Sequence, residues 1–77
     1  MELQQRVEKA FTDALDLPAD VDWATLEYRQ YETWSSLGHM TLVAALEEEF
    51  DAMMEADDIL EMSSFNKAVE IMRKYDA

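Results

Sequence analysis

Two adjacent hydroxyls and a histidine are the residues of this sequence best suited to chemistry. Ser35 and Ser36 follow Trp34, and His39 comes three residues after Ser36. Residues three apart share a face of a helix, so Ser36 and His39 are spaced as a nucleophile and its general base would be. No glycine turn that could form an oxyanion hole precedes the serine, and no downstream residue is placed to orient the imidazole. We therefore favour a surface or loop-packing histidine over a catalytic dyad, and we expect no enzymatic activity.

The same region gives only weak evidence for a metal-binding site. His39 would be a lone imidazole ligand among carboxylates, and a chain without cysteine has no thiolate zinc site. An EF-hand loop counted from Asp51 fails, because its sixth residue is Ala56 rather than glycine and its twelfth is Met62 rather than glutamate. Loose divalent binding to the acidic surface stays open, but we predict no defined metal site. The acidic residues concerned are Asp51, Glu55, Asp57, Asp58 and Glu61.

Length and charge restrict the function classes. The chain has 77 residues, which we read as one domain spanning 1–77. Eighteen acidic residues against six Lys and Arg give a net charge of −12, which argues against binding to nucleic acids or anionic lipids. The hydrophobic fraction of 49% is too high for an acidic disordered tail. We expect a folded domain whose acidic surface suits basic partners.

The first residues do not resemble a targeting signal. Met1 to Arg6 lack the basic stretch and apolar run of a signal peptide, and no apolar run approaches the roughly 18 residues of a membrane span. We therefore expect a cytoplasmic protein that does not insert into membranes, and we expect it to be a monomer.

Apolar residues at helical spacing predict a first helix from about Glu2 to about Asp16, which ends before Pro18. A long connection from Pro18 to Trp34 follows without a clear period. Its aromatic residues suggest that it packs onto the domain, with contact to a partner as the alternative. The aromatic residues are Trp23, Tyr28, Tyr31 and Trp34.

The second half of the chain predicts two more long helices and a short one. The second helix should begin at Ser35 or Ser36, with Ser35 as N-cap, and reach about Met53. One helical turn is expected at Ile59–Met62, and Ser63 or Ser64 should cap a last helix. The fold class is therefore all-α: a small four-helix bundle of three longer helices and one short helix with a long first loop. The expected core comprises Phe11, Leu15, Leu42, Leu46, Phe50, Phe65, Val69 and Met72.

The sequence around Ser36 resembles that of the acyl carrier protein family. Those proteins carry Asp-Ser-Leu at the start of the second helix and Leu-Glu-Glu-x-Phe nearly three turns later. Ser36-Leu37 and Leu46 to Phe50 fit that pattern in register. The resemblance extends to overall size, the Pro-containing loop after the first helix and the final helix. It implies an acyl-carrier-protein-like fold. The sequence is slightly closer to that of a pathway-specific bacterial carrier than to that of the housekeeping fatty-acid carrier.

The resemblance also implies a cofactor. In this family the serine hydroxyl is esterified by 4′-phosphopantetheine, which a phosphopantetheinyl transferase takes from coenzyme A. The arm ends in a thiol that holds acyl groups as thioesters for fatty-acid, polyketide or related biosynthesis. Ser36 is then the attachment site. The family's usual Asp before that serine is here Ser35, a departure that bears on recognition by the transferase and leaves two adjacent hydroxyls. The register with Leu37 favours Ser36.

The partners implied are the transferase and the acyl-loading, condensing and acyl-transfer enzymes, which dock through basic patches. The acidic residues of the second helix form either a solvated face or a docking surface, and we favour docking; they are Glu47, Glu48, Glu49 and Asp51. For Met40, core packing is an equal alternative. An aminoacyl or peptidyl carrier is one alternative function, and an unmodified acidic adaptor of the same fold is another. The expected docking residues are Leu37, Met40, Glu47, Glu48, Asp51, Asp57 and Asp58.

Overall fold

The first predicted helix forms where its apolar spacing places it. The computed structural model describes residues 2–76, and in it helix α1 spans Leu3–Leu15. Val7, Ala10, Phe11 and Leu15 make its buried side. The helix stops because Asp16 adopts a left-handed conformation, with φ of 53°, and Pro18 follows two residues later.

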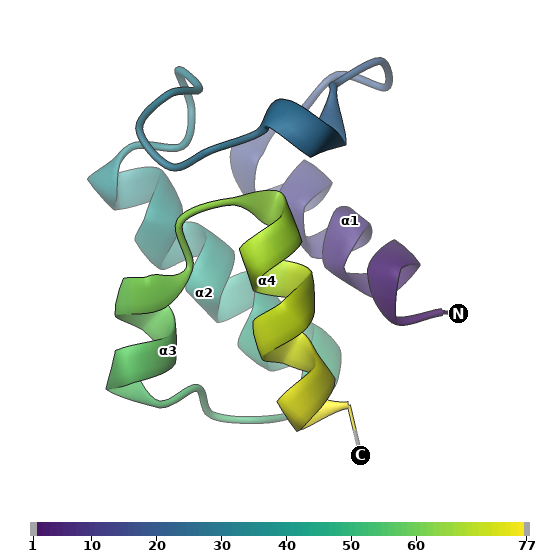
Figure 1. The fold of residues 1–77 in the computed structure, drawn as a ribbon, viewed down its shortest axis with the longest axis vertical. Helices are drawn as coiled ribbons and strands as arrows, with labels where there is room; N and C mark the ends of the chain where they lie inside the picture. Colours follow the sequence, from purple (N-terminus) through teal and green to yellow (C-terminus); the bar gives the residue numbers. More distant parts are fainter. Residues whose placement is uncertain (1, 77) are drawn as a thin grey trace.

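Helix α2 spans Ser36–Phe50 and packs mainly against α1 (Figure 1). Its start agrees with the prediction, but its end at Met53 was wrong. Asp51 adopts a left-handed conformation, with φ of 50°, and its N–H bonds to the carbonyls of Glu47 and Glu48. The chain therefore turns away, Met53 is 85% exposed, and Met54 enters the core in its place.

The short third helix is longer than predicted, and the last helix begins as predicted. Helix α3 spans Ala56–Glu61, so it begins three residues before the predicted turn at Ile59–Met62 and ends before Met62, which is its C-cap. Helix α4 spans Phe65–Met72 and continues as the 3₁₀ helix η2, Arg73–Tyr75. The Ser64 hydroxyl caps α4 by accepting from the Lys67 N–H at 3.0 Å.

The long first loop is an ordered part of the domain and contains a 3₁₀ helix, η1, Trp23–Thr25. It crosses over the ends of the helices and meets the junction of α3 and α4 (Figure 1). There the Tyr28 N–H donates to the Ser63 carbonyl at 2.9 Å, and the Phe65 N–H donates to the Leu26 carbonyl at 3.1 Å. The prediction that this segment packs onto the domain is confirmed.

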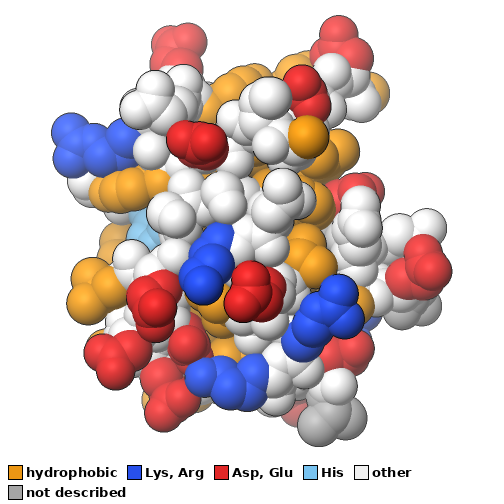
Figure 2. Space-filling model, viewed as in Figure 1, with side chains coloured by type: hydrophobic (Ala, Val, Ile, Leu, Met, Phe, Trp, Pro, Cys, Tyr) orange, Lys and Arg blue, Asp and Glu red, His pale blue; other side chains and the backbone are white. Residues whose placement is uncertain are grey.

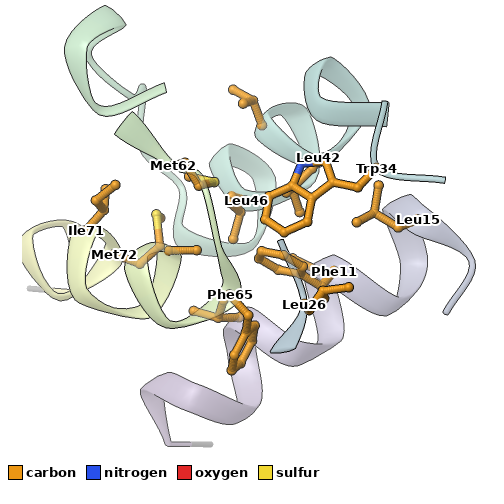
Figure 3. Close-up of a cluster of buried hydrophobic side chains, with 14 of the residues drawn as sticks. Phe11, Leu15, Leu26, Trp34, Leu42, Leu46, Met62, Phe65, Ile71 and Met72 are labelled. Carbon is orange, nitrogen blue, oxygen red and sulfur yellow. The ribbon is translucent and has the colours of Figure 1, made fainter. Parts of the chain in front are cut away.

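An aromatic cluster joins the loop to the helices. The Phe11 ring meets Trp34 edge to face at 5.0 Å and Phe65 at 5.2 Å (Figure 3). Trp34 is fully buried, so a loop residue that was left out of the predicted core is one of its largest members. Of the predicted core, Val69 is only partly buried and Ile71 is buried instead. The other seven predicted core residues, Phe11, Leu15, Leu42, Leu46, Phe50, Phe65 and Met72, are buried.

Over residues 2–76 the structure is thus a small bundle of four α-helices with a long first loop, which confirms the all-α prediction at this level. Within residues 2–76, no helix is both long enough and apolar enough to cross a membrane.

Candidate functional site

The two adjacent serines have different surroundings. Ser35 is the N-cap of α2, and its Oγ accepts from the Gly38 N–H at 3.3 Å. Ser36 is the first residue of α2 and is exposed, with its Oγ 3.2 Å from the Tyr28 hydroxyl. Both serines are therefore exposed, but the Ser35 Oγ caps the backbone of α2, whereas the Ser36 Oγ contacts only a side chain of the loop.

His39 is held by two groups other than Ser36. The Trp34 Nε1–H donates to His39 Nδ1 at 2.9 Å, and His39 Nε2 lies 2.8 Å from the Ile59 carbonyl oxygen. A carbonyl oxygen only accepts, so Nε2 carries the hydrogen and the imidazole is the neutral tautomer that can accept at Nδ1. Both ring nitrogens are thus engaged, and His39 has no free nitrogen with which to deprotonate Ser36.

An apolar cleft of about 270 Å³ lies beside the Ser36 hydroxyl. It runs between the start of α2, the loop and α3, and it combines one hydroxyl-bearing serine with mostly apolar walls. An acyl or other aliphatic group tethered at this point would contact hydrophobic side chains. The lining residues are Tyr28, Ser36, His39, Met40, Ile59, Leu60 and Met62.

Large hydrophobic side chains are exposed around this cleft. Leu37 is 79% exposed, Met40 62% and Leu60 82%, which excludes the alternative that Met40 belongs to the core. Exposed apolar residues that adjoin one another often mark a surface for a partner. We call Leu37, Met40 and Leu60 the apolar rim.

Acidic side chains accompany the apolar rim. Glu48, Asp51 and Asp57 are exposed, whereas Glu47 is half-buried and accepts the Met54 N–H at 2.9 Å. Figure 2 shows acidic side chains gathered over α3, below hydrophobic side chains and the single histidine. The structure therefore exposes five of the seven predicted docking residues, but not all of them beside Ser36: Leu37 and Met40 lie in the first turns of α2, Asp57 lies on α3, and Glu48 and Asp51 lie at the far end of α2.

Asp58 does not join this surface. It is buried, its Oδ2 accepts from the Tyr75 hydroxyl at 2.5 Å, and it pairs with Lys74 Nζ at 2.6 Å. These contacts tie the C-terminal segment to α3. We call Asp58, Lys74 and Tyr75 the C-terminal clasp.

The C-terminal clasp shifts the pKa of each of its members. The Lys74 ammonium and the Tyr75 hydroxyl hold the pKa of Asp58 below its ordinary value. The Asp58 carboxylate raises the pKa of Lys74 in turn, and burial together with the same carboxylate raises the pKa of Tyr75. The clasp is therefore formed from a charged carboxylate, a charged amine and a neutral phenol at neutral pH.

Glu49 is also turned away from the docking surface. Its carboxylate pairs with Arg6 Nε at 3.3 Å and with Lys9 Nζ at 3.4 Å, both on α1. The Arg6 guanidinium also donates to the Glu49 carbonyl and lies over the Phe50 ring, 4.1 Å from its centroid. Part of the acidic run thus has a structural role in fixing the end of α2 to α1.

Four residues that line the cleft were not predicted as site residues from the sequence: Tyr28, Ile59, Leu60 and Met62. The sequence predicts loop packing or partner contact for Tyr28, and the contact of its hydroxyl with Ser36 places it at the site. An exposed leucine in a short helix flanked by acidic residues was a visible signal for Leu60. Ile59 contributes its carbonyl oxygen, which no side-chain pattern can indicate.

No family model matches the chain, and comparisons with curated proteins and with solved structures give no match either. Among residues 2–76, no three side chains of the metal-binding kinds converge on one point. A function for the chain must therefore be argued from Ser36 and its surroundings.

Proposed function

We propose that this chain is an acyl carrier protein. The Ser36 hydroxyl takes a 4′-phosphopantetheine arm from coenzyme A, and the thiol of the arm holds an acyl group for partner enzymes. The observation that carries this proposal is the exposed Ser36 hydroxyl on the first residue of α2, at the edge of an apolar cleft.

The position of Ser36 suits a phosphodiester. The N–H groups of the first helical turn point toward the helix N-terminus, and the helix dipole places partial positive charge there. A phosphate esterified to Ser36 would lie beside this end of α2, a favourable position for an anion. Because Ser35 already caps the Gly38 N–H, the helix end is stable without the arm.

The cleft beside Ser36 suits a carrier of apolar cargo. The arm would start at one edge of the cleft, so an acyl chain on its thiol can fold back onto hydrophobic walls. Each methylene of the chain that is removed from water would stabilise this docked position by about 0.8 kcal/mol. A docked chain would also shield the thioester end from solvent.

The exposed surface of α2 and α3 suits brief contacts with several enzymes. The apolar rim supplies short-range contacts, and Glu48, Asp51 and Asp57 supply a negative field for basic patches on partners. The partners would be the phosphopantetheinyl transferase and the enzymes that load, condense and transfer acyl groups.

The proposal can be tested by measuring thiols, because the sequence contains no cysteine. The unmodified chain contains no titratable thiol. After incubation with coenzyme A and a broad-specificity transferase, it should gain the mass of one phosphopantetheine and one titratable thiol per chain. A chain that gains neither with several transferases would contradict the proposal and favour the acidic adaptor. Loading of the arm by an amino-acid-activating enzyme, and by no acyl-loading enzyme, would favour an aminoacyl carrier.

A further inference from the structure

The Tyr28 hydroxyl lies 3.2 Å from the Ser36 Oγ. The rest of Tyr28 is fixed on several sides. Its N–H donates to the Ser63 carbonyl, and its ring lies 4.9 Å from the His39 ring and 6.1 Å from the Trp34 ring. The phenol is therefore held in place by the loop, α2 and the junction of α3 with α4, and its hydroxyl lies against the exposed Ser36 hydroxyl.

This contact limits how the serine hydroxyl can turn. An exposed serine has three staggered orientations of its side chain, and a hydrogen bond to a fixed partner favours one of them. When the more acidic Tyr28 hydroxyl donates, the Ser36 O–H stays free for a base on the transferase, and Oγ keeps a lone pair for attack. The contact can thus orient the nucleophile without consuming its proton.

The same hydroxyl has a role after modification. An esterified Ser36 Oγ carries no hydrogen, so from then on Tyr28 can only donate. The phosphodiester oxygens next to Oγ are charged and accept hydrogen bonds more strongly than an ester oxygen. A Tyr28 hydroxyl that donates to them would hold the base of the arm near the cleft.

We propose that Tyr28 is a positioning residue for Ser36: its hydroxyl orients Oγ before transfer and donates to the phosphodiester afterwards. This inference rests on the proposed function. In the transfer, the bond from Ser36 Oγ to the phosphorus of the pantetheine phosphate forms. The bond from that phosphorus to the oxygen of adenosine 3′,5′-bisphosphate breaks, and the serine proton passes to a base on the transferase.

The test is Tyr28→Phe, which removes the hydroxyl and keeps the ring. Tyr31→Phe is the matched control, because it removes a hydroxyl from another half-buried tyrosine of the same loop. The measurements are kcat and KM for transfer from coenzyme A, with the chain as varied substrate, and the ³¹P NMR signal of the modified protein. We expect Tyr28→Phe to lower kcat about fivefold with KM nearly unchanged, as loss of one hydrogen bond would. We also expect its ³¹P signal to move relative to wild type and to Tyr31→Phe.

The outcomes separate the two proposals. If wild type takes the arm and Tyr28→Phe matches it in kcat and in the ³¹P signal, the role of Tyr28 is contradicted and the carrier function stands. If wild type takes no arm, the carrier function fails, and the role of Tyr28 fails with it. A fall in kcat that Tyr31→Phe shows equally would assign the effect to the loop as a whole and would also overturn the role of the Tyr28 hydroxyl.

Discussion

The indole of Trp34 donates a hydrogen bond of 2.9 Å to Nδ1 of His39. Trp34 is fully buried at the end of the first loop, and His39 lies in the first part of α2. The other ring nitrogen of His39 reaches the Ile59 carbonyl of α3. One imidazole thus joins the loop, α2 and α3 beside Ser36, and its role in this structure is to hold the walls of the cleft together.

Loss of this bridge should destabilise the fold. His39→Phe keeps a ring but leaves the buried Trp34 N–H without its acceptor, which costs about 1–3 kcal/mol. Urea denaturation should show that fall in the free energy of unfolding. Met40→Leu, at the exposed neighbouring position, should change it by less than about 0.5 kcal/mol. Equal stability of His39→Phe and wild type would contradict the bridge.

Replacing Gly38 by alanine should lower the free energy of unfolding, although Gly38 lies within a helix. Replacing glycine by alanine inside a helix commonly stabilises it by about 1 kcal/mol. Here an added Cβ would lie 2.1 Å from the Thr33 carbonyl oxygen and 3.2 Å from Leu15 Cδ2. The loop would have to move, so we expect Gly38→Ala to lose about 1–3 kcal/mol in urea denaturation. A gain in stability would show that Thr33 does not pack closely on α2.

The C-terminal clasp predicts a dependence of stability on acid. Because the pKa of Asp58 is lower in the folded protein than its ordinary 3.8, its contribution is present at neutral pH and is lost as pH falls through the folded value. Lys74 and Tyr75 have raised pKa values, so their contributions remain at neutral pH and are lost only in strong alkali. Asp58→Asn should therefore melt a few degrees below wild type at pH 7, and the difference should shrink toward pH 3.

The neighbouring Asp57 gives the control for this experiment, because it is exposed on the same helix. Asp57→Asn should melt close to wild type across the same pH range. A constant difference between Asp58→Asn and wild type from pH 7 to pH 3 would rule out the carboxylate of the clasp as its source.

The acidic surface predicts a salt-dependent encounter with the transferase. Glu48→Lys reverses a charge on the exposed side of α2 and should lower kcat/KM about threefold at low ionic strength, mainly through association. The effect should fade as added salt screens the charges. Glu70→Lys makes the same change on α4, where the side chain is 71% exposed, and should leave kcat/KM close to wild type. Equal losses in both variants would show that net charge matters and that position on α2 does not.

Local signals explain what the sequence predicted well. The period of the apolar residues and Pro18 located α1, and Ser35 and Ser64 located the starts of α2 and α4, because caps and periodicity act within one or two turns. The predicted end of α2 was wrong because Met53 continues the apolar period, although the helix ends at Phe50 and Asp51 is its left-handed C-cap. A period in the sequence does not report a left-handed residue.

The remaining features depend on contacts between distant elements. Trp34 lies in a loop without a period, so its full burial against Phe11 follows only from how the loop packs. The sequence predicts Asp58 as an exposed docking residue, because its burial depends on Lys74 and Tyr75, which the C-terminal segment places against it. The Tyr28 contact to Ser36 likewise depends on the path of an irregular loop.

The most direct test of the carrier proposal compares the two adjacent serines. Ser35→Ala and Ser36→Ala are each incubated with coenzyme A and a broad-specificity transferase, and their intact masses are compared with wild type. We expect Ser35→Ala to gain one phosphopantetheine although it loses its N-cap and about 1 kcal/mol of stability. We expect Ser36→Ala to gain none. A gain that survives in Ser36→Ala, or no gain in wild type, would contradict the attachment of the arm to Ser36.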